Sequence, residues 1–447
     1  MKPYLLTNLA AIVLLLFIAR PAPAERHWID GVTVQSGATV ELTARDGYIN
    51  TPDGAGIYMW GYAHGDGAMQ YPGPTLILSQ GASVTVSLRN NLGTNVSIVF
   101  PGQTNVTASG GVQGLLTSEA PPGGNVTYTF TANKPGTYLY HSGTRQDLQV
   151  EMGLVGALIV RPSASTQAYE HVRTSFDQEY LFLLSECDPA VHQAVETGHP
   201  ARADMTAFWP VYWFINGRCG PDTMVAANVT WLPSQPYDCS PMMEPGDKLL
   251  LRLVGAGRDP HPFHLHGNNA TIIARDGRLL ESQPGVSGPD LAVSDFTITV
   301  APGQTTDALF EWTGYKLGWD IYGHTSTNDD LMPHEYAPDH GKPFPVTLPN
   351  MMDLTYGAHY GGSQFLGTSG MLPPAGNQGL NPYGAFMFMW HSHNEKEIVN
   401  NNVFPGGMLT MMMVMPPSTN MVMMGAAPKT TGPGPERDTR IFYKTKK

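Results

Sequence analysis

The sequence has few charged residues. Only 14% of its residues are charged, and 37 acidic side chains outnumber 25 basic ones, which gives a formal net charge of −12 at pH 7. Recognition of phosphate backbones requires a basic surface, so this balance argues against a nucleic-acid partner. An acidic surface is instead suited to cations.

Cysteine is also scarce, with Cys187, Cys219 and Cys239 as the three examples. None of them lies in a C-x-x-C spacing, so a structural role is favoured over metal binding. In an oxidising compartment one disulfide is plausible, and we predict Cys219–Cys239 because both residues lie in turns bounded by proline or glycine.

Long apolar runs are absent beyond the N-terminus. The run from residue 9 to residue 19 precedes Ala22-Pro23-Ala24, a small-residue pattern typical of signal-peptide cleavage. We predict a signal peptide over residues 1–24, with an uncleaved anchor as the alternative. The mature chain should then be secreted or periplasmic and have no membrane span.

Glycine and proline are abundant, with 49 and 38 residues, which favours many short strands over long helices. Ser83–Leu88 and Asn125–Phe130 alternate with period two, as half-buried antiparallel strands require. We predict an all-β chain with two sandwich or barrel units. The predicted segments are a first unit (27–162), a connector (163–205) with a short helix near Pro189–Glu196, a second unit (206–416) with an insertion (313–384), and a flexible tail (417–447).

Two histidine-rich segments carry the chemical signal. His261-Pro262-Phe263-His264-Leu265-His266-Gly267 holds three imidazoles, the ligands that copper and zinc prefer. On a strand, His264 and His266 share one face and His261 takes the other. In Phe386–His393 the same parity places Met387, Met389, His391 and His393 on one face and the aromatic residues on the other, which we expect to be the core.

These segments resemble the third and fourth histidine motifs of the multicopper oxidases. Tyr71–Thr75 is similar to the family's early strand, Gly136–Ser142 to its second motif and Phe214–Arg218 to the start of its later domain. The resemblance implies two cupredoxin-like (plastocyanin-like) Greek-key domains and copper as the cofactor. Position by position, it assigns His141 and His393 to one type 3 copper, His266 and His391 to the other, and His264 to the type 2 copper.

Several ligands of the family pattern are missing. The cysteine that provides a thiolate to type 1 blue copper is replaced by Ser392, and the type 1 histidine expected four residues after His393 is Glu397. Of the type 1 ligands, His261 remains, together with Met408 at a position shifted from that of the usual axial methionine. The first motif reads Val99-Phe100-Pro101-Gly102 and contains no histidine, and the second keeps only His141. We therefore expect no blue centre, and Glu397 is a candidate substitute ligand.

Three functional hypotheses follow. The first is a secreted copper protein with a histidine-rich site at a domain or subunit interface, acting as an oxidoreductase on a small-molecule or metal-ion reductant. The second is a non-catalytic copper carrier or sequestering protein, which the 22 methionines favour. The third is a structural partner subunit. The family resemblance also implies that a homotrimer could assemble the site between subunits.

Overall fold

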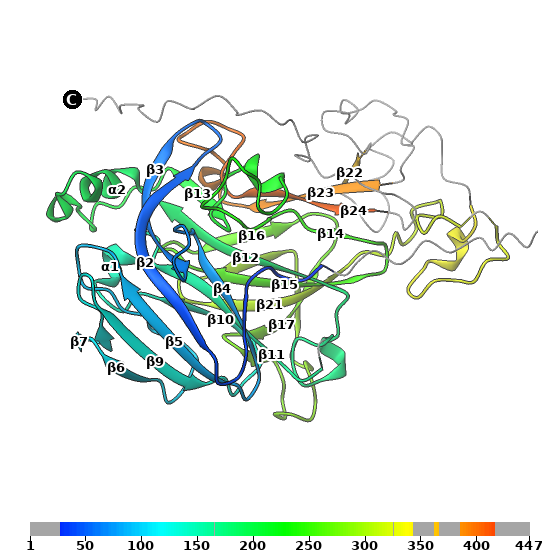
Figure 1. Ribbon diagram of the computed structural model, residues 1–447. Helices are drawn as coiled ribbons and strands as arrows, with labels where there is room; N and C mark the ends of the chain where they lie inside the picture. Colours follow the sequence, from blue (N-terminus) through cyan, green and yellow to red (C-terminus); the bar gives the residue numbers. More distant parts are fainter. Residues whose placement is uncertain (1–26, 165, 325, 343–361, 366–384, 416–447) are drawn as a thin grey trace, which may run out of the picture.

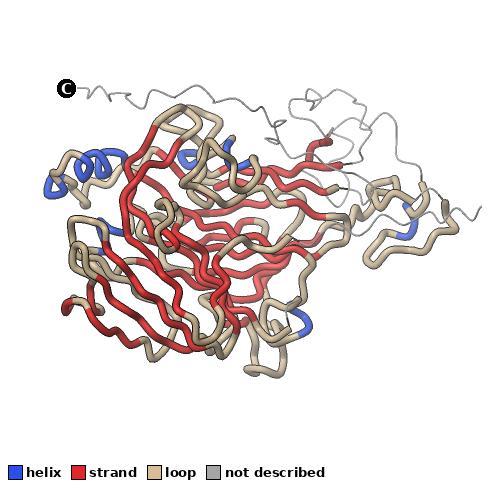
Figure 2. The backbone as a smooth tube through the Cα atoms, viewed as in Figure 1, coloured by secondary structure: helices blue, strands red, loops and turns tan. Residues whose placement is uncertain are grey.

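The computed structural model describes residues 27–164, 166–324, 326–342, 362–365 and 385–415. Strands dominate this part of the chain, and helices are short and peripheral (Figure 2). The prediction of an all-β fold is confirmed. The predicted signal peptide, the tail and much of the insertion lie outside the described residues. Within the described residues, no helix is both long and apolar enough to cross a membrane.

The first unit consists of two sheets that enclose one core. Alternation along β5 buries Val84, Val86 and Leu88 against the facing sheet. β5 pairs antiparallel with β9 (Asn125–Thr131), but parallel with β2 (Thr39–Asn50) on its other side. One sheet has the order β1 (Val32–Val34), β4 (Gly73–Ser79), β11 (Val155–Arg161), β10 (Gly136–His141), and the other β3 (Gly56–His64), β2 (Thr39–Asn50), β5 (Ser83–Asn90), β9 (Asn125–Thr131), β6 (Thr107–Gly110), beside a ribbon of β7 (Val112–Gln113) and β8 (Ser118–Glu119).

The second unit repeats this two-layer plan with a separate core, to which Phe263, Phe388 and Trp390 belong. One sheet has the order β13 (Tyr212–Ile215), β12 (Gln178–Cys187), β15 (Lys248–Gly255), β21 (Thr305–Glu311), β17 (Ala270–Arg275), β18 (Arg278–Leu279), with β19 (Val293–Asp295) also on β17. The other has the order β14 (Met242–Met243), β24 (Leu409–Val414), β23 (Ala385–Ser392), β16 (His261–Leu265), β20 (Thr297–Val300), with β22 (Gly362–Phe365) also on β23.

A third apolar cluster joins the two units. Leu139 and Ile159 of the first unit belong to the same buried cluster as Leu183, Phe214 and Val254 of the second. Because apolar surface is removed from water between them, the units pack face to face, and Figure 1 shows β10 and β11 beside β12 and β15.

The segment expected to be a connector is more structured than its mixed polarity indicated. It contains β12, every residue of which is buried, and β12 pairs in parallel with β15 inside the larger sheet. The strand can bury several polar side chains because they have hydrogen-bond partners in the tertiary structure, as Glu186 does. The helix predicted near Pro189–Glu196 is confirmed. The helices are α1 (Gln146–Gln149) and α2 (Pro189–Glu196), and the 3-10 turns are η1 (Val172–Thr174), η2 (Pro200–Arg202), η3 (Asp222–Met224), η4 (Ala337–Asp339) and η5 (Glu395–Glu397).

The predicted Cys219–Cys239 disulfide is wrong, because both cysteines are free and buried. Cys219 belongs to the core between the units, whereas Cys239 belongs to the core of the second unit. Their thiols donate to the carbonyl oxygens of Trp213 and Ile215, respectively. Cys219 and Cys239 therefore lie on opposite sides of β13, although both belong to turns that are close in sequence.

Candidate metal centre

The histidines of β16 and β23 meet across two neighbouring antiparallel strands. His264 is directly opposite His391, and the pairs on either side are Phe263 with Ser392 and Leu265 with Trp390. The aromatic and aliphatic partners are buried in the core, so period two turns the two histidines to the other face. The strand parity predicted from the sequence is thus confirmed.

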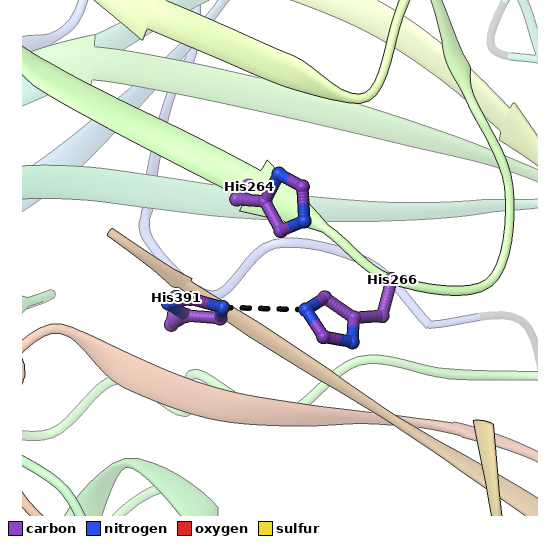
Figure 3. Close-up of side chains that lie close together, drawn as sticks. All are labelled: His264, His266 and His391. Atoms are coloured by element: carbon purple, nitrogen blue, oxygen red, sulfur yellow. Dashed lines mark hydrogen bonds between the residues drawn. The ribbon is translucent and has the colours of Figure 1, made fainter. Parts of the chain in front are cut away.

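Three imidazoles converge on one space (Figure 3). The Nε2 atoms of His266 and His391 are 3.3 Å apart. The ring centroid of His264 lies 4.9 Å from that of His266 and 5.5 Å from that of His391. Nitrogen atoms bound to one copper or zinc ion at about 2.0 Å are roughly 3 Å apart, so this spacing matches ligation of a shared ion.

A fourth imidazole borders the trio from the solvent side. The ring centroid of His393 is 4.7 Å from that of His264 and 5.6 Å from that of His391. Its side chain is 53% exposed. His393 therefore lies at the solvent-facing edge of the trio.

The environment keeps His264 and His391 neutral, and neutral imidazole is the form that binds metal. Burial, followed by the neighbouring His266, His391 and His393, lowers the pKa of His264 to about 4. Burial also lowers the pKa of His391, although its hydrogen bond to a backbone carbonyl opposes this shift.

Two hydrogen bonds orient the rings. The Nδ1 atom of His391 lies 2.7 Å from the carbonyl oxygen of Ser392, to which it donates as Nδ1–H, so its Nε2 lone pair faces His266. The Nδ1 atom of His264 lies 2.6 Å from the Thr297 hydroxyl. Outer partners of this kind are what hold metal-binding histidines in one tautomer and orientation.

His141 remains separate from this cluster in the single chain. It ends β10 in the first unit, where its Nδ1 lies 2.9 Å from the carbonyl oxygen of Ser142 and burial lowers its pKa. Among the described residues, the three histidines whose ligand atoms lie within 4.8 Å of one another do not include it.

His261 occupies a different environment on the core side of β16, as its parity predicts. It is fully buried, with Nδ1 2.9 Å from a carboxylate oxygen of Glu397 and Nε2 3.0 Å from one of Glu186. Burial lowers its pKa, but the hydrogen bonds to the two carboxylates outweigh that effect and raise the pKa to about 9. His261 is therefore an imidazolium at neutral pH, and we call these three residues the buried triad.

Glu397 had been a candidate ligand beside His393, and the structure directs it to His261 instead. Its other oxygen accepts from the side-chain amide of Asn394, while the Ser392 hydroxyl accepts from the backbone of that asparagine. Glu186 was not predicted as a site residue. The signal for it was a carboxylate two residues after the apolar run Tyr180–Leu184 of β12, where a buried charge requires a partner.

The buried triad predicts a specific dependence of stability on pH. Because the pKa of His261 is raised from about 6.5 in the unfolded chain to about 9, its contribution is complete below pH 6.5 and is lost as pH rises through 9. The loss should be at most about 3 kcal/mol. Urea unfolding between pH 6 and pH 10 measures it, and a His261→Gln variant should lack this component. An unchanged slope in that variant would contradict the assignment.

Two family profiles, both described as Multicopper oxidase, match residues 66–165 and 232–317. The chain therefore contains two multicopper oxidase domains. Copper resistance protein A from Escherichia coli is 24% identical over 272 residues, which cover 54% of this chain and 42% of that protein. The protein of the same name from Pseudomonas syringae pv. tomato is 24% identical over 295 residues, covering 55% and 44%. The chain thus matches less than half the length of these two curated relatives.

Solved multicopper oxidases share the fold. The blue copper oxidase from Nitrosomonas europaea superimposes with a TM-score of 0.54 at 19% identity, covering 84% of this chain and 85% of that one. This likeness confirms the cupredoxin-like architecture. Multicopper oxidases use copper, and the converging neutral imidazoles of this chain fit such an ion because their outer nitrogens are already held by hydrogen bonds.

Proposed function

We propose that this chain is a secreted copper-binding oxidoreductase without type 1 blue copper. Its copper is held by His264, His266, His391 and His393, which we call the imidazole site. The observation that carries the proposal is the convergence of His264, His266 and His391 beside two paired strands, with the ring of His393 next to them. His141 completes the site from a neighbouring copy, in an assembly that the family resemblance suggests is a homotrimer.

The buried triad supports the absence of type 1 copper. A blue centre requires a cysteine thiolate, and a serine hydroxyl is a poor substitute because it stays protonated near neutral pH. Ser392 and His261 lie where the family resemblance places this centre, and His261 is bonded on both ring nitrogens. As an imidazolium, His261 donates to Glu397 from Nδ1 and to Glu186 from Nε2, so neither ring nitrogen offers a lone pair to a metal.

When bound, copper supplies one-electron oxidation and reduction. The chain's own residues orient the ligands and set access to the site. Thr297 and the Ser392 carbonyl hold the imidazoles in orientation. The exposed ring of His393 leaves the site accessible to a reductant from solvent. Without a relay copper in this chain, the reductant would have to reach the site directly.

One observation favours a copper carrier as a second candidate. Met387 is opposite Met413, and Met389 is opposite Met411, on the strand face that also bears His391. Met242 pairs with Met413 from the next strand. Thioether sulfur is a soft ligand suited to Cu(I), and this methionine face is continuous with the imidazole site. Transfer of Cu(I) to a chelator without substrate turnover would favour the carrier.

The proposal predicts a copper-loaded protein that is not blue. Without a Cu–thiolate bond, the intense orange-red absorption and the type 1 resonance signal should be absent, while bound Cu(II) gives an imidazole-type signal. Metal analysis together with optical and paramagnetic-resonance spectra of the mature protein tests this. A strong blue band would overturn the assignment at Ser392, and a chain that binds no copper would overturn the function.

A further inference from the structure

A second group of potential ligands lies far from the imidazole site in sequence. Asp320, His324, Glu335 and His340 each direct one ligand atom into a common space, all within 4.8 Å of one another. They belong to the segment that follows β21, which projects at the end of the molecule away from α2 (Figure 1). We call these four residues the loop cluster.

The spacing within the loop cluster is that of a small coordination shell. His324 Nδ1 lies 2.9 Å from Asp320 Oδ2 and 3.4 Å from Glu335 Oε1. His340 Nδ1 lies 2.8 Å from Glu335 Oε1 and 4.0 Å from Asp320 Oδ2. A tetrahedron with metal–ligand bonds of about 2.0 Å has edges of roughly 3.3 Å, so these distances scatter around the expected value.

The cluster is largely removed from solvent. The side chains of Asp320 and Glu335 are 0% and 2% exposed, and those of His324 and His340 are 14% and 10% exposed. Two carboxylates held this closely and out of water repel each other unless positive charge lies between them. Neutral imidazoles cannot provide that charge.

The hydrogen-bond pattern also calls for a cation. His340 Nε2 faces the carbonyl oxygen of Asp329 at 2.9 Å, and a carbonyl only accepts. With its proton on Nε2, a neutral His340 turns the lone pair of Nδ1 toward the Glu335 carboxylate, 2.8 Å away. That contact is repulsive unless the ring is protonated or a metal ion lies between the two groups. A backbone carbonyl on the outer nitrogen is the usual partner of a metal-binding histidine.

Backbone groups fix the carboxylates from behind. The amide of Tyr322 donates to Asp320 Oδ1, and that of Met332 donates to Glu335 Oε2. Asp320 Oδ2 accepts from the amide of Gly341, and with its second lone pair it faces the imidazoles, as Glu335 Oε1 does. Trp319 and Ile321, on either side of Asp320, are buried in the core of the second unit. The part of the loop that carries Asp320 is thus anchored to the core. The cluster joins the part that carries Glu335 and His340 to this anchored part.

We propose that the loop cluster is a structural zinc(II) site that joins these two parts of the loop. Two imidazoles and two carboxylates neutralise the ion and complete a four-coordinate tetrahedral shell, which is typical of a closed structural zinc site. The site would stabilise the loop over residues 319–342 and has no open position for substrate.

Zinc binding is best tested in the full-length chain with the imidazole site silenced by His391→Ala and His393→Ala. After chelator treatment and reloading, we expect one zinc per chain and, with Co(II) as the probe, the intense visible bands of tetrahedral coordination. Adding His324→Ala and His340→Ala should weaken zinc binding by more than about 100-fold, since even the loss of an outer partner costs 10–100-fold.

Two further variants keep the test decisive. Asp320→Asn preserves side-chain size and should also weaken binding, whereas His334→Ala, an exposed histidine of the same loop paired with Glu311, should not. Near-UV circular dichroism checks folding. No zinc in the silenced background, unchanged binding after His324→Ala and His340→Ala, or the weak bands of octahedral Co(II) would each overturn the proposal. The copper assignment would be unaffected, because it rests on a different set of residues.

Discussion

Tight copper binding should be abolished by the combined His391→Ala and His393→Ala change. These residues provide two of the four converging imidazoles, and His391 is the one whose Nε2 lies nearest to His266. His264 and His266 alone would leave a two-ligand remnant. We expect copper affinity to fall by 100-fold or more, since loss of an outer partner alone costs about 10–100-fold. Calorimetric titration and copper content after desalting measure the effect.

The matched controls are histidines outside the imidazole site. His334→Ala removes an exposed imidazole from another loop and should leave copper binding intact. His261→Ala, assayed on folded protein, should also retain most of it, because His261 is engaged by two carboxylates on the core side of β16. If His261→Ala abolished binding and the double change did not, the metal would occupy the remnant type 1 position and the site assignment would be wrong.

The largest loss of stability should come from His261→Ala. The substitution leaves Glu186 and Glu397 buried and facing each other without their shared cation. Removing one partner of a buried ion pair destabilises a protein by about 3–5 kcal/mol, because the remaining charge cannot be solvated. We expect a decrease of this size in the free energy of unfolding at pH 7, measured in urea.

Two comparisons show whether the charge is responsible. His334→Ala, which breaks an exposed ion pair with Glu311, should change the free energy of unfolding by no more than about 1 kcal/mol. Adding Glu397→Gln to His261→Ala removes one of the two orphaned carboxylates and should restore part of the loss. Equal destabilisation by both single changes would mean that the buried triad contributes nothing beyond a surface pair.

Much of the imidazole site could be predicted without tertiary information. Alternation along β16 and β23 has period two, so the shared face of His264 and His266, and the opposite face of Phe388 and Trp390, follow from local geometry. The same parity correctly separated His261 from the others. The family resemblance then suggested which strands lie together, and His264 does pair with His391.

Partners distant in sequence could not be read in this way. His261 meets Glu186 and Glu397 across 75 and 136 residues, respectively, and no periodicity links those positions. His324 and His340 lie apart in a loop without a regular repeat, and only the folded loop brings their ring centroids to 4.5 Å from each other.

The sequence alone therefore determined the all-β class, the faces of the histidine strands and the residues available as ligands, because these depend on composition and on the local strand repeat. Only the tertiary structure decided that Cys219 and Cys239 lie in different cores, that Glu397 faces His261, and that the loop cluster exists. Each of these depends on which surfaces are brought together when apolar area is buried, and that is a property of the whole chain.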